Sequence, residues 1–352
     1  MKIVHCSDLH LGKKVSGNRE YVKKRYEDFF SAFENFIAKV KEINPDICII
    51  AGDIFDKKEI SPDILSKTEN LFKELRSYVK KEVIAIEGNH DNSKALEDSW
   101  LEYLHEQSLL KVFYFNKNFE EENYLKIEDI NFYPIGYPGF MIDEALTKLS
   151  EKLNPQEKNI VVVHTGISGS TNTLPGLVST SILDLFKDKA IYIAGGHIHS
   201  FTTYPKEKPY FFVSGSLEFS NVQNEKSDKK GFILFDTDTL KYEFKITYKL
   251  IDYQKIIYID LPKVIEIYDP YVVDVHVSPI YSIAYEEGRT PETITYYDSE
   301  NPNFLKLKET GVQIGMLFDA LFTLSPVMYF NEECYEKLIK VPKEELLKRL
   351  EG

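Results

Sequence analysis

Short apolar runs rich in β-branched residues recur along the first half of the chain. Runs of this length and composition are typical of buried strands rather than of helices. The predicted strands are Lys2–Cys6, Ile47–Ala51, Val83–Ile86, Ile160–Val163 and Ile191–Ala194.

Longer segments with apolar positions at helical spacing separate these runs. Between Tyr21 and Ile43, for example, Phe29, Phe33 and Phe36 fall on one side of a helix. Ser61 followed by Pro62 is a typical helix start. The predicted helices are 21–43, 62–79, 93–107, 143–153 and 180–186, and a strand-dominated pattern follows from 209 to 250. Alternating strands and helices predict an α/β fold.

A polar segment that carries Asp, His or Asn directly follows each predicted strand. The segments are Ser7-Asp8-Leu9-His10, Gly52-Asp53, Gly88-Asn89-His90-Asp91, His164 and Gly196-His197-Ile198-His199. Each alone is compatible with an ordinary turn or a helix cap, with Asp91 or Ser93 as the capping residue. Because ligands bind outside the carboxyl ends of strands in α/β folds, the five together predict a two-metal site for phosphoester chemistry.

The residue types fit this chemistry. Hydrolysis of a phosphodiester needs positive charge at the phosphate and a hydroxide near neutral pH, and two divalent ions about 3.5–4 Å apart supply both. Asp53 is the candidate bridging carboxylate, since imidazole cannot offer one oxygen to each ion. Nitrogen and oxygen ligands without a thiolate favour Mn²⁺, with Fe²⁺, Zn²⁺ or Mg²⁺ as alternatives. In an extended segment the i, i+2 spacing would point Asp8 and His10 to one side.

This set of motifs resembles the calcineurin-like metallophosphoesterase superfamily over about residues 1–250. The start Ser7-Asp8-Leu9-His10-Leu11-Gly12, and Gly215-Ser216-Leu217-Glu218 followed by Lys230-Gly231-Phe232, resemble the SbcD type of DNA-repair nuclease. The resemblance implies a four-layer α/β/β/α sandwich, Mn²⁺-dependent exonuclease and endonuclease activity on DNA, and a partner ATPase of the SMC-like SbcC type. It also implies a homodimer through the first helices.

The resemblance further implies how the ligands are divided. One ion is held by Asp8, His10, His199 and Asp53, and the other by Asn89, His164, His197 and Asp53. His90 is the catalytic histidine, which protonates the leaving oxygen or stabilises charge on the phosphoryl group. Asp56, where archaeal and eukaryotic relatives have His, is either a support for a ligand histidine or an exposed loop acid.

Charge is distributed unevenly along the chain. The net charge of −13 comprises −5 in residues 1–250 and −8 in residues 251–352. Lys13, Lys14 and Arg19 follow the Asp8/His10 pair, and we expect them to contact a polyanionic substrate, with a solvated loop as the alternative.

The composition is that of an ordinary globular protein. The chain has 352 residues, of which 43% are hydrophobic and 28% charged. No apolar stretch approaches the ~18 residues of a membrane-spanning helix, and no signal peptide is expected. Cys6, Cys48 and Cys334 lie far apart, which favours reduced thiols and a cytoplasmic location.

The sequence predicts three parts: a catalytic domain at 1–253, a small α+β cap at 254–327 and a helical tail at 328–352. From Val264 to Leu305, Arg289 is the only basic residue against eight acidic ones, which argues against a clamp for duplex DNA. The cap would then bind a protein or restrict access to single-strand ends.

Three alternatives stay open. The tail docks on the coiled coil of an SbcC-like ATPase or packs on its own cap. The segment Gly166–Ser179 is a lid over the site or a connector. An enzyme of another class, a phosphodiesterase or phosphatase for small substrates, would keep the same ligands.

Overall fold

A computed structural model describes residues 1–15, 19–91, 99–116, 123–168, 175–220, 229–249, 257–260, 276–283 and 292–295. By its internal contacts the chain divides into two compact units, and the first comprises Met1–Asn221 and Glu225–Tyr248. The metal-ligand candidates all lie in this first unit.

The first six-stranded sheet combines the four N-terminal strands of the first unit with its two last strands. Its strand order is β12-β11-β1-β2-β3-β4, with β1, β2, β3 and β4 parallel and β11 antiparallel to β1. The strands are β1 (Lys2–Cys6), β2 (Ile47–Ile50), β3 (Glu82–Ile86), β4 (Lys111–Phe113), β11 (Lys229–Asp236) and β12 (Lys241–Lys249).

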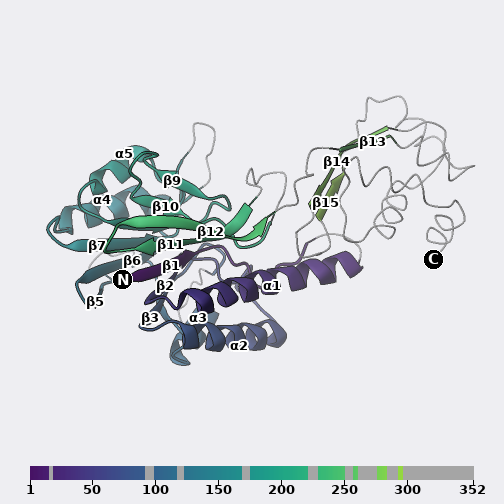
Figure 1. Ribbon diagram of the computed structural model, residues 1–352, viewed down its shortest axis with the longest axis horizontal. Helices are drawn as coiled ribbons and strands as arrows, with labels where there is room; N and C mark the ends of the chain where they lie inside the picture. The colour runs from purple at the N-terminus through teal and green to yellow at the C-terminus, as the bar shows by residue number, and fades with distance from the viewer. Residues whose placement is uncertain are drawn as a thin grey trace, which may run out of the picture. The chain divides into compact units, whose positions relative to one another are not determined.

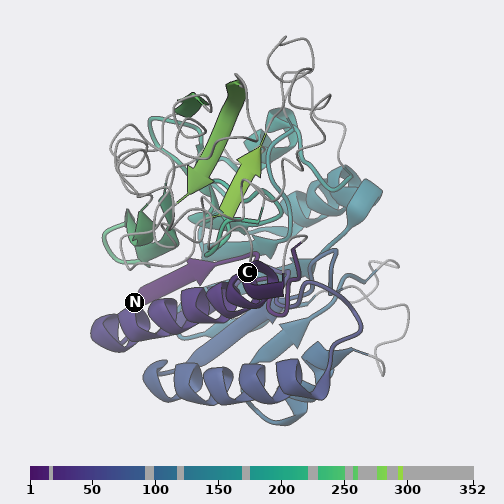
Figure 2. The same cartoon turned by 90° about the vertical axis from the view of Figure 1, so that its right-hand side faces the viewer.

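Two long helices run side by side along this sheet, α1 (Arg19–Ile43) and α2 (Pro62–Tyr78) (Figures 1 and 2). Phe33 of α1 contacts Phe72 of α2 with ring centroids 5.2 Å apart. Phe36 of α1 meets Phe232 of β11 edge to face at 5.0 Å, so α1 packs on the outer face of the sheet. Ser61 caps α2 by accepting a hydrogen bond from the Ile64 N–H.

The second six-stranded sheet has the order β5-β6-β7-β8-β10-β9. Helix α4 (Ile142–Lys152) packs on its outer face, with Leu146 and Leu149 buried against Val161 and Val163 of β7. The strands are β5 (Leu125–Ile127), β6 (Ile130–Gly136), β7 (Lys158–Val163), β8 (Tyr192–Gly195), β9 (Thr202–Tyr204) and β10 (Phe211–Val213). The remaining helical elements are α3 (Trp100–Glu106), η2 (Gly139–Met141), α5 (Thr180–Leu183) and η3 (Asp184–Phe186).

The inner faces of the two sheets form one buried core. Ile3 and Ile84 of the first sheet pack with Ile130, Ile160 and Phe212 of the second, each at most 1% exposed. This arrangement of two sheets between helices confirms the predicted α/β sandwich.

A polar link crosses this core. His5 of β1 shares a 2.8 Å hydrogen bond with the Tyr192 hydroxyl, and its Nε2 donates to the Gly195 carbonyl at 3.0 Å. Burial lowers the pKa of His5 from 6.5 to about 3, so the ring is neutral and joins the two sheets without a charge.

The predicted strand and helix ends agree with the structure to within two residues for most elements. The exception is α3, which begins at Trp100 after its cap Ser99 rather than at Ser93; residues 92–98 lie outside the described part. Strands β4, β5 and β6 were not predicted individually.

In the second unit the structure describes a three-stranded antiparallel sheet with the order β13-β14-β15. Its strands are β13 (Ile257–Asp260), β14 (His276–Ile283) and β15 (Glu292–Thr295). The predicted helical tail at 328–352 and Cys334 lie outside the described residues, and the domain boundaries stay predictions. Within the described ranges, no helix is both long and apolar enough to span a membrane.

Candidate metal centre

Five strand ends from both sheets meet at one edge of the sandwich. Asp8 and His10 follow β1, Asp53 follows β2 and Asn89 follows β3 in the first sheet, while His164 follows β7 and the pair His197 and His199 follows β8 in the second. Because β1, β2 and β3 are mutually parallel, as are β7 and β8, their carboxyl ends point to the same edge. The structure therefore brings together all seven predicted ligands.

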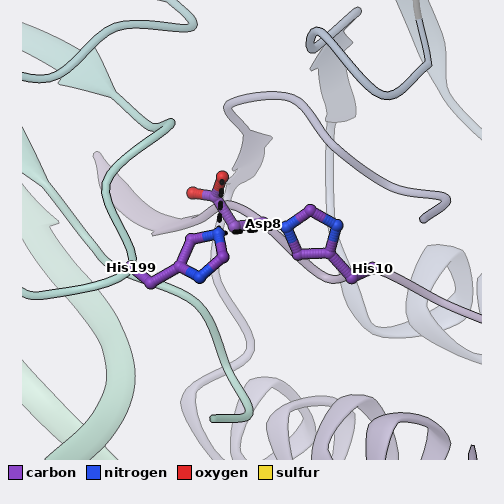
Figure 3. A group of neighbouring side chains, drawn as sticks. All are labelled: Asp8, His10 and His199. Carbon is purple, nitrogen blue, oxygen red and sulfur yellow. Dashed lines mark hydrogen bonds and ion pairs between the residues drawn. The ribbon is translucent and has the colours of Figure 1, made fainter. Parts of the chain in front are cut away.

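Asp8, His10 and His199 form one group of ligand atoms (Figure 3). His199 Nε2 lies 3.9 Å from Asp8 Oδ1 and 3.1 Å from His10 Nε2. The Asp8 carboxylate also accepts the His197 N–H at 3.1 Å, which fixes it beside the second sheet. Two neighbouring imidazole nitrogens beside a carboxylate are a suitable donor set for a divalent cation.

Asn89, His164 and His197 form the other group. The Asn89 amide oxygen lies 2.8 Å from His197 Nδ1 and 3.1 Å from His164 Nε2. His164 Nδ1 donates to the Ala51 carbonyl at 2.7 Å, so its Nε2 is left free to bind a metal. The Tyr137 ring packs on His164 and His197, with centroids 5.8 and 5.7 Å away.

Asp53 stands between the two groups. Its Oδ2 lies 3.4 Å from His164 Nε2 and 3.8 Å from His10 Nε2. Burial disfavours the charged carboxylate, but His164 and His10 hold the pKa of Asp53 well below its ordinary value. In turn, burial would lower the pKa of His164, whereas the Asp53 carboxylate raises it to about 9. The site thus favours a negative charge on Asp53 and positive charge beside it, as expected where a bridging carboxylate would meet two cations.

The backbone at these ligands is not extended. Asp8, His10, Asp53 and His197 have φ values of 54°, 47°, 54° and 71°, in the left-handed region. The expectation that strand alternation aligns Asp8 with His10 is therefore wrong, because tight left-handed turns turn both side chains inward. Left-handed non-glycine residues are strained and concentrate at functional sites.

His90 is fixed from two directions. Its N–H donates to Asp53 Oδ1 at 2.8 Å, and its Nδ1 donates to the Asp56 carbonyl at 2.7 Å. Its ring lies edge to face with His10 at 4.8 Å between centroids. A carbonyl only accepts, so Nδ1 carries a hydrogen and Nε2 is the atom left to exchange a proton.

The three predicted substrate-binding residues are placed differently. Lys13 is half-buried, and its Nζ lies 2.9 Å from Asp56 Oδ1. Lys14 is exposed. Arg19 begins α1, and its side chain lies outside the described part of the structure.

Asp56 is buried beside a ligand histidine and is not an exposed loop acid. It is 8% exposed, and its Oδ1 lies 3.5 Å from His10 Nδ1. This is the position expected of a residue that orients a ligand histidine.

Asp91 plays a part that the sequence did not reveal. The interpretation of Asp91 as a helix cap is wrong, because its carboxylate accepts the N–H groups of Ile54, Phe55 and Gly88 at 3.0, 2.9 and 3.1 Å. It thereby joins the loop of Asp53 to the loop of Asn89. Burial and the neighbouring Asp53 raise the pKa of Asp91 to about 7. The available signal was its place as the last residue of the Gly88-Asn89-His90-Asp91 motif.

The donor set fits two divalent metals. Three overlapping groups of carboxylate and imidazole atoms, Asp8 with His10 and His199, His10 with Asp53 and His90, and Asp8 with Asp53 and His164, each lie within 4.8 Å. At Gly88, a Cβ would collide with the Asp53 carboxylate and backbone, so the loops approach closely only because this residue has no side chain.

The chain matches a family model and is similar to several solved structures. A family model described as calcineurin-like phosphoesterase matches residues 1–201. A structure from Thermus thermophilus is 13% identical with a TM-score of 0.44, and the match covers 70% of this chain and 98% of that one. A dimetal phosphatase of Danio rerio is 10% identical with a TM-score of 0.44, covering 72% and 94%. An archaeal phosphodiesterase is 13% identical with a TM-score of 0.36, covering 70% and 99%. The family model spans more than half of the chain and includes all seven predicted ligands.

Proposed function

We propose, because the chain belongs to the calcineurin-like phosphoesterase family, that it is a two-metal nuclease that cleaves phosphodiester bonds in DNA. The observation that carries the proposal is the convergence of six other nitrogen and oxygen ligands around Asp53. When bound, two divalent ions would neutralise charge on the phosphate and acidify water. Mn²⁺ is the proposed metal.

The side chains divide the work around that centre. Asp8, His10 and His199 would hold one ion and Asn89, His164 and His197 the other, with Asp53 shared. His90 would protonate the leaving oxygen through Nε2, since Nδ1 is occupied by the Asp56 carbonyl at 2.7 Å. The hydrogen bond from the His90 N–H to Asp53 ties the proton donor to the shared ligand.

Two further observations support DNA as the substrate class. The SbcD-like signatures at 7–12, 215–218 and 230–232 point to a DNA-repair nuclease. On the rim, Phe140 is 88% exposed in η2, three residues after Tyr137, whose ring packs on the ligands His164 and His197. An exposed ring at this position suits stacking with a nucleobase next to the cleaved bond.

Partners follow from the same resemblance. We infer that an SMC-like ATPase of the SbcC type acts with this chain and that the chain forms a homodimer. The acidic composition of residues 264–305 favours a second candidate, a phosphodiesterase for small substrates, because that segment offers little positive charge to DNA phosphates.

The test is a substrate panel with purified protein and Mn²⁺. End-labelled single-stranded and double-stranded DNA are compared with bis(p-nitrophenyl) phosphate, beside a His90→Ala control. Cleavage of DNA that disappears in the variant supports the nuclease. Hydrolysis of the small diester with DNA untouched, also after addition of an SbcC-like ATPase, favours the second candidate.

A further inference from the structure

A buried lysine lies beneath the ligand His199. Lys230, in β11, is 1% exposed. Its ammonium donates to the His199 carbonyl at 2.7 Å and to the Ser216 hydroxyl at 2.8 Å. It also lies 4.5 Å from the centroid of the Phe219 ring. An ammonium removed from water is costly, so its retention calls for partners of this kind.

The His199 carbonyl is held by two donors at once. Besides Lys230, the Ser216 N–H donates to it at 3.3 Å. Gly215 before it has φ +77°, and a Cβ there would lie 2.8 Å from the same carbonyl oxygen. The loop that carries Gly215 and Ser216 can therefore approach His199 only with glycine at this position.

The same loop is attached to the strand that delivers Asp8. Ser7 and Ser216 form a β-bridge, and the Ser7 and Ser214 hydroxyls are 2.9 Å apart. Lys230 is thus linked through Ser216 to the segment that ends in Asp8, another ligand of the same metal position. One side chain joins His199 to the loop that lies against Asp8.

A second buried cation holds the backbone of Phe219, whose ring lies near the Lys230 ammonium. Arg25, 0% exposed, donates to Glu218 Oε1 at 3.2 Å and to the Phe219 carbonyl at 2.5 Å. Glu218 in turn accepts the Phe219 N–H at 2.9 Å. The residues Ser216, Glu218 and Lys230 of the two sequence signatures therefore belong to one buried support.

We propose that Lys230 is a positioning residue that holds His199 in place and so sets the metal affinity at the Asp8, His10 and His199 position. The inference rests on the proposed two-metal function. The contacts of Lys230 described above, with His199 and Ser216, lie on the side of this metal position. Loss of the ammonium should therefore weaken one ion selectively, whereas a purely structural role would lower stability and weaken both ions alike.

The test is Mn²⁺ binding by isothermal titration calorimetry, with thermal stability measured in parallel. Lys230→Met removes the charge with little change in length, and Lys230→Arg retains a donor. Lys245→Met is the control, since Lys245 is a partly exposed lysine of the adjacent strand that pairs with Glu243 at 2.6 Å. Supports of metal ligands typically change metal affinity by about 10–100-fold.

We expect Lys230→Met to lower the affinity for one ion by about 10–100-fold and to leave the other unchanged, with partial recovery in Lys230→Arg. If Lys230→Met binds both ions with wild-type affinity, or if its affinity for both ions falls equally, the inference is overturned. If Lys230→Met does not fold, Ser216→Ala takes its place, with a few-fold loss at the same ion expected and no loss contradicting the proposal.

The two proposals fail separately. If the wild-type protein binds two ions but cleaves no DNA, and Lys230→Met loses one ion selectively, the inference about Lys230 holds. The nuclease proposal then fails. Wild-type protein that binds fewer than two ions overturns both.

Discussion

The two halves of the metal centre are supported in different ways. In the His199 half (Asp8, His10 and His199), charged side chains provide support: Lys230 holds the His199 carbonyl at 2.7 Å, and Asp56 lies 3.5 Å from His10. In the His164 half (Asn89, His164 and His197), the support is the Ala51 carbonyl and the ring of Tyr137. The first half should thus be sensitive to single charge changes, and the second to changes of backbone fit.

The largest expected effect removes the residue that the halves share. Asp53→Ala deletes the carboxylate that lies between His10 and His164. We expect loss of both ions and a fall in turnover of at least about 10⁴-fold. Mn²⁺ titration and hydrolysis of bis(p-nitrophenyl) phosphate measure the two effects. Retention of both ions would show that Asp53 is not the shared ligand.

A smaller effect should separate chemistry from metal binding. His90→Ala removes the proposed proton donor but no predicted ligand, so turnover should fall by about 10²–10⁴-fold while both ions stay bound. The measurements are again Mn²⁺ titration and hydrolysis of bis(p-nitrophenyl) phosphate. Rates like those of the wild type would contradict the role of His90.

Backbone fit in the His164 half can be tested at Gly52. This residue has φ +92°, and a Cβ there would collide with the His164 ring. Gly52→Ala should weaken one ion by about 10–100-fold. Gly139→Ala is the matched control, because Gly139 also has a positive φ of 58° but its Cβ would meet Tyr137 at an ordinary 3.7 Å. Equal metal binding in the two variants would remove the steric explanation.

The hydrogen-bonded link that His5 makes between the two sheets should depend on pH. The pKa of His5 falls from 6.5 to about 3 on folding because burial disfavours the charged ring. The contribution of neutral His5 to the free energy of unfolding is fully present above pH 6.5. It is lost as the pH falls toward 3, by a few kcal/mol at most. Urea unfolding of wild type and His5→Gln measures it. The difference in unfolding free energy between wild type and His5→Gln should shrink on acidification. A difference that stays constant with pH would contradict the lowered pKa of His5.

A last effect concerns the exposed Phe140 in η2, three residues after Tyr137. Phe140→Ala removes the exposed ring near Tyr137, and stacking of one base contributes about 1–3 kcal/mol. Affinity for single-stranded DNA, measured by fluorescence anisotropy with Ca²⁺, should fall about 5- to 150-fold, and hydrolysis of the small diester should not change. Leu240→Ala, at another exposed apolar residue, is the control. Unchanged affinity in Phe140→Ala would exclude stacking at this position.

Sequence reasoning located the site because its signal is local. Each ligand directly follows a β-branched run, and the carboxyl ends of parallel strands meet at one edge of a sheet, so Asp53 and Asn89 could be placed together from the sequence alone. The position of Asp56 beside His10 was likewise one of two stated alternatives.

What the sequence could not reveal depends on contacts between distant segments. The left-handed turns at Asp8 and His10 are imposed by hydrogen bonds to the loop after β2, such as His10 N–H to the Asp53 carbonyl at 3.1 Å. Lys230 reaches His199 across 31 positions of sequence, and Asp91 serves loops on two strands. Their burial and partners are set by the packing of the sandwich, which no local pattern encodes.

The central claim is that these side chains hold two metal ions bridged by Asp53. The most direct measurement is electron paramagnetic resonance of the protein loaded with Mn²⁺, with the bound metal counted in the same sample. Two ions per chain with an exchange-coupled spectrum, replaced in His199→Ala by the spectrum of an isolated ion, are the predicted result. One ion per chain, or two without magnetic coupling, would contradict a bridged pair.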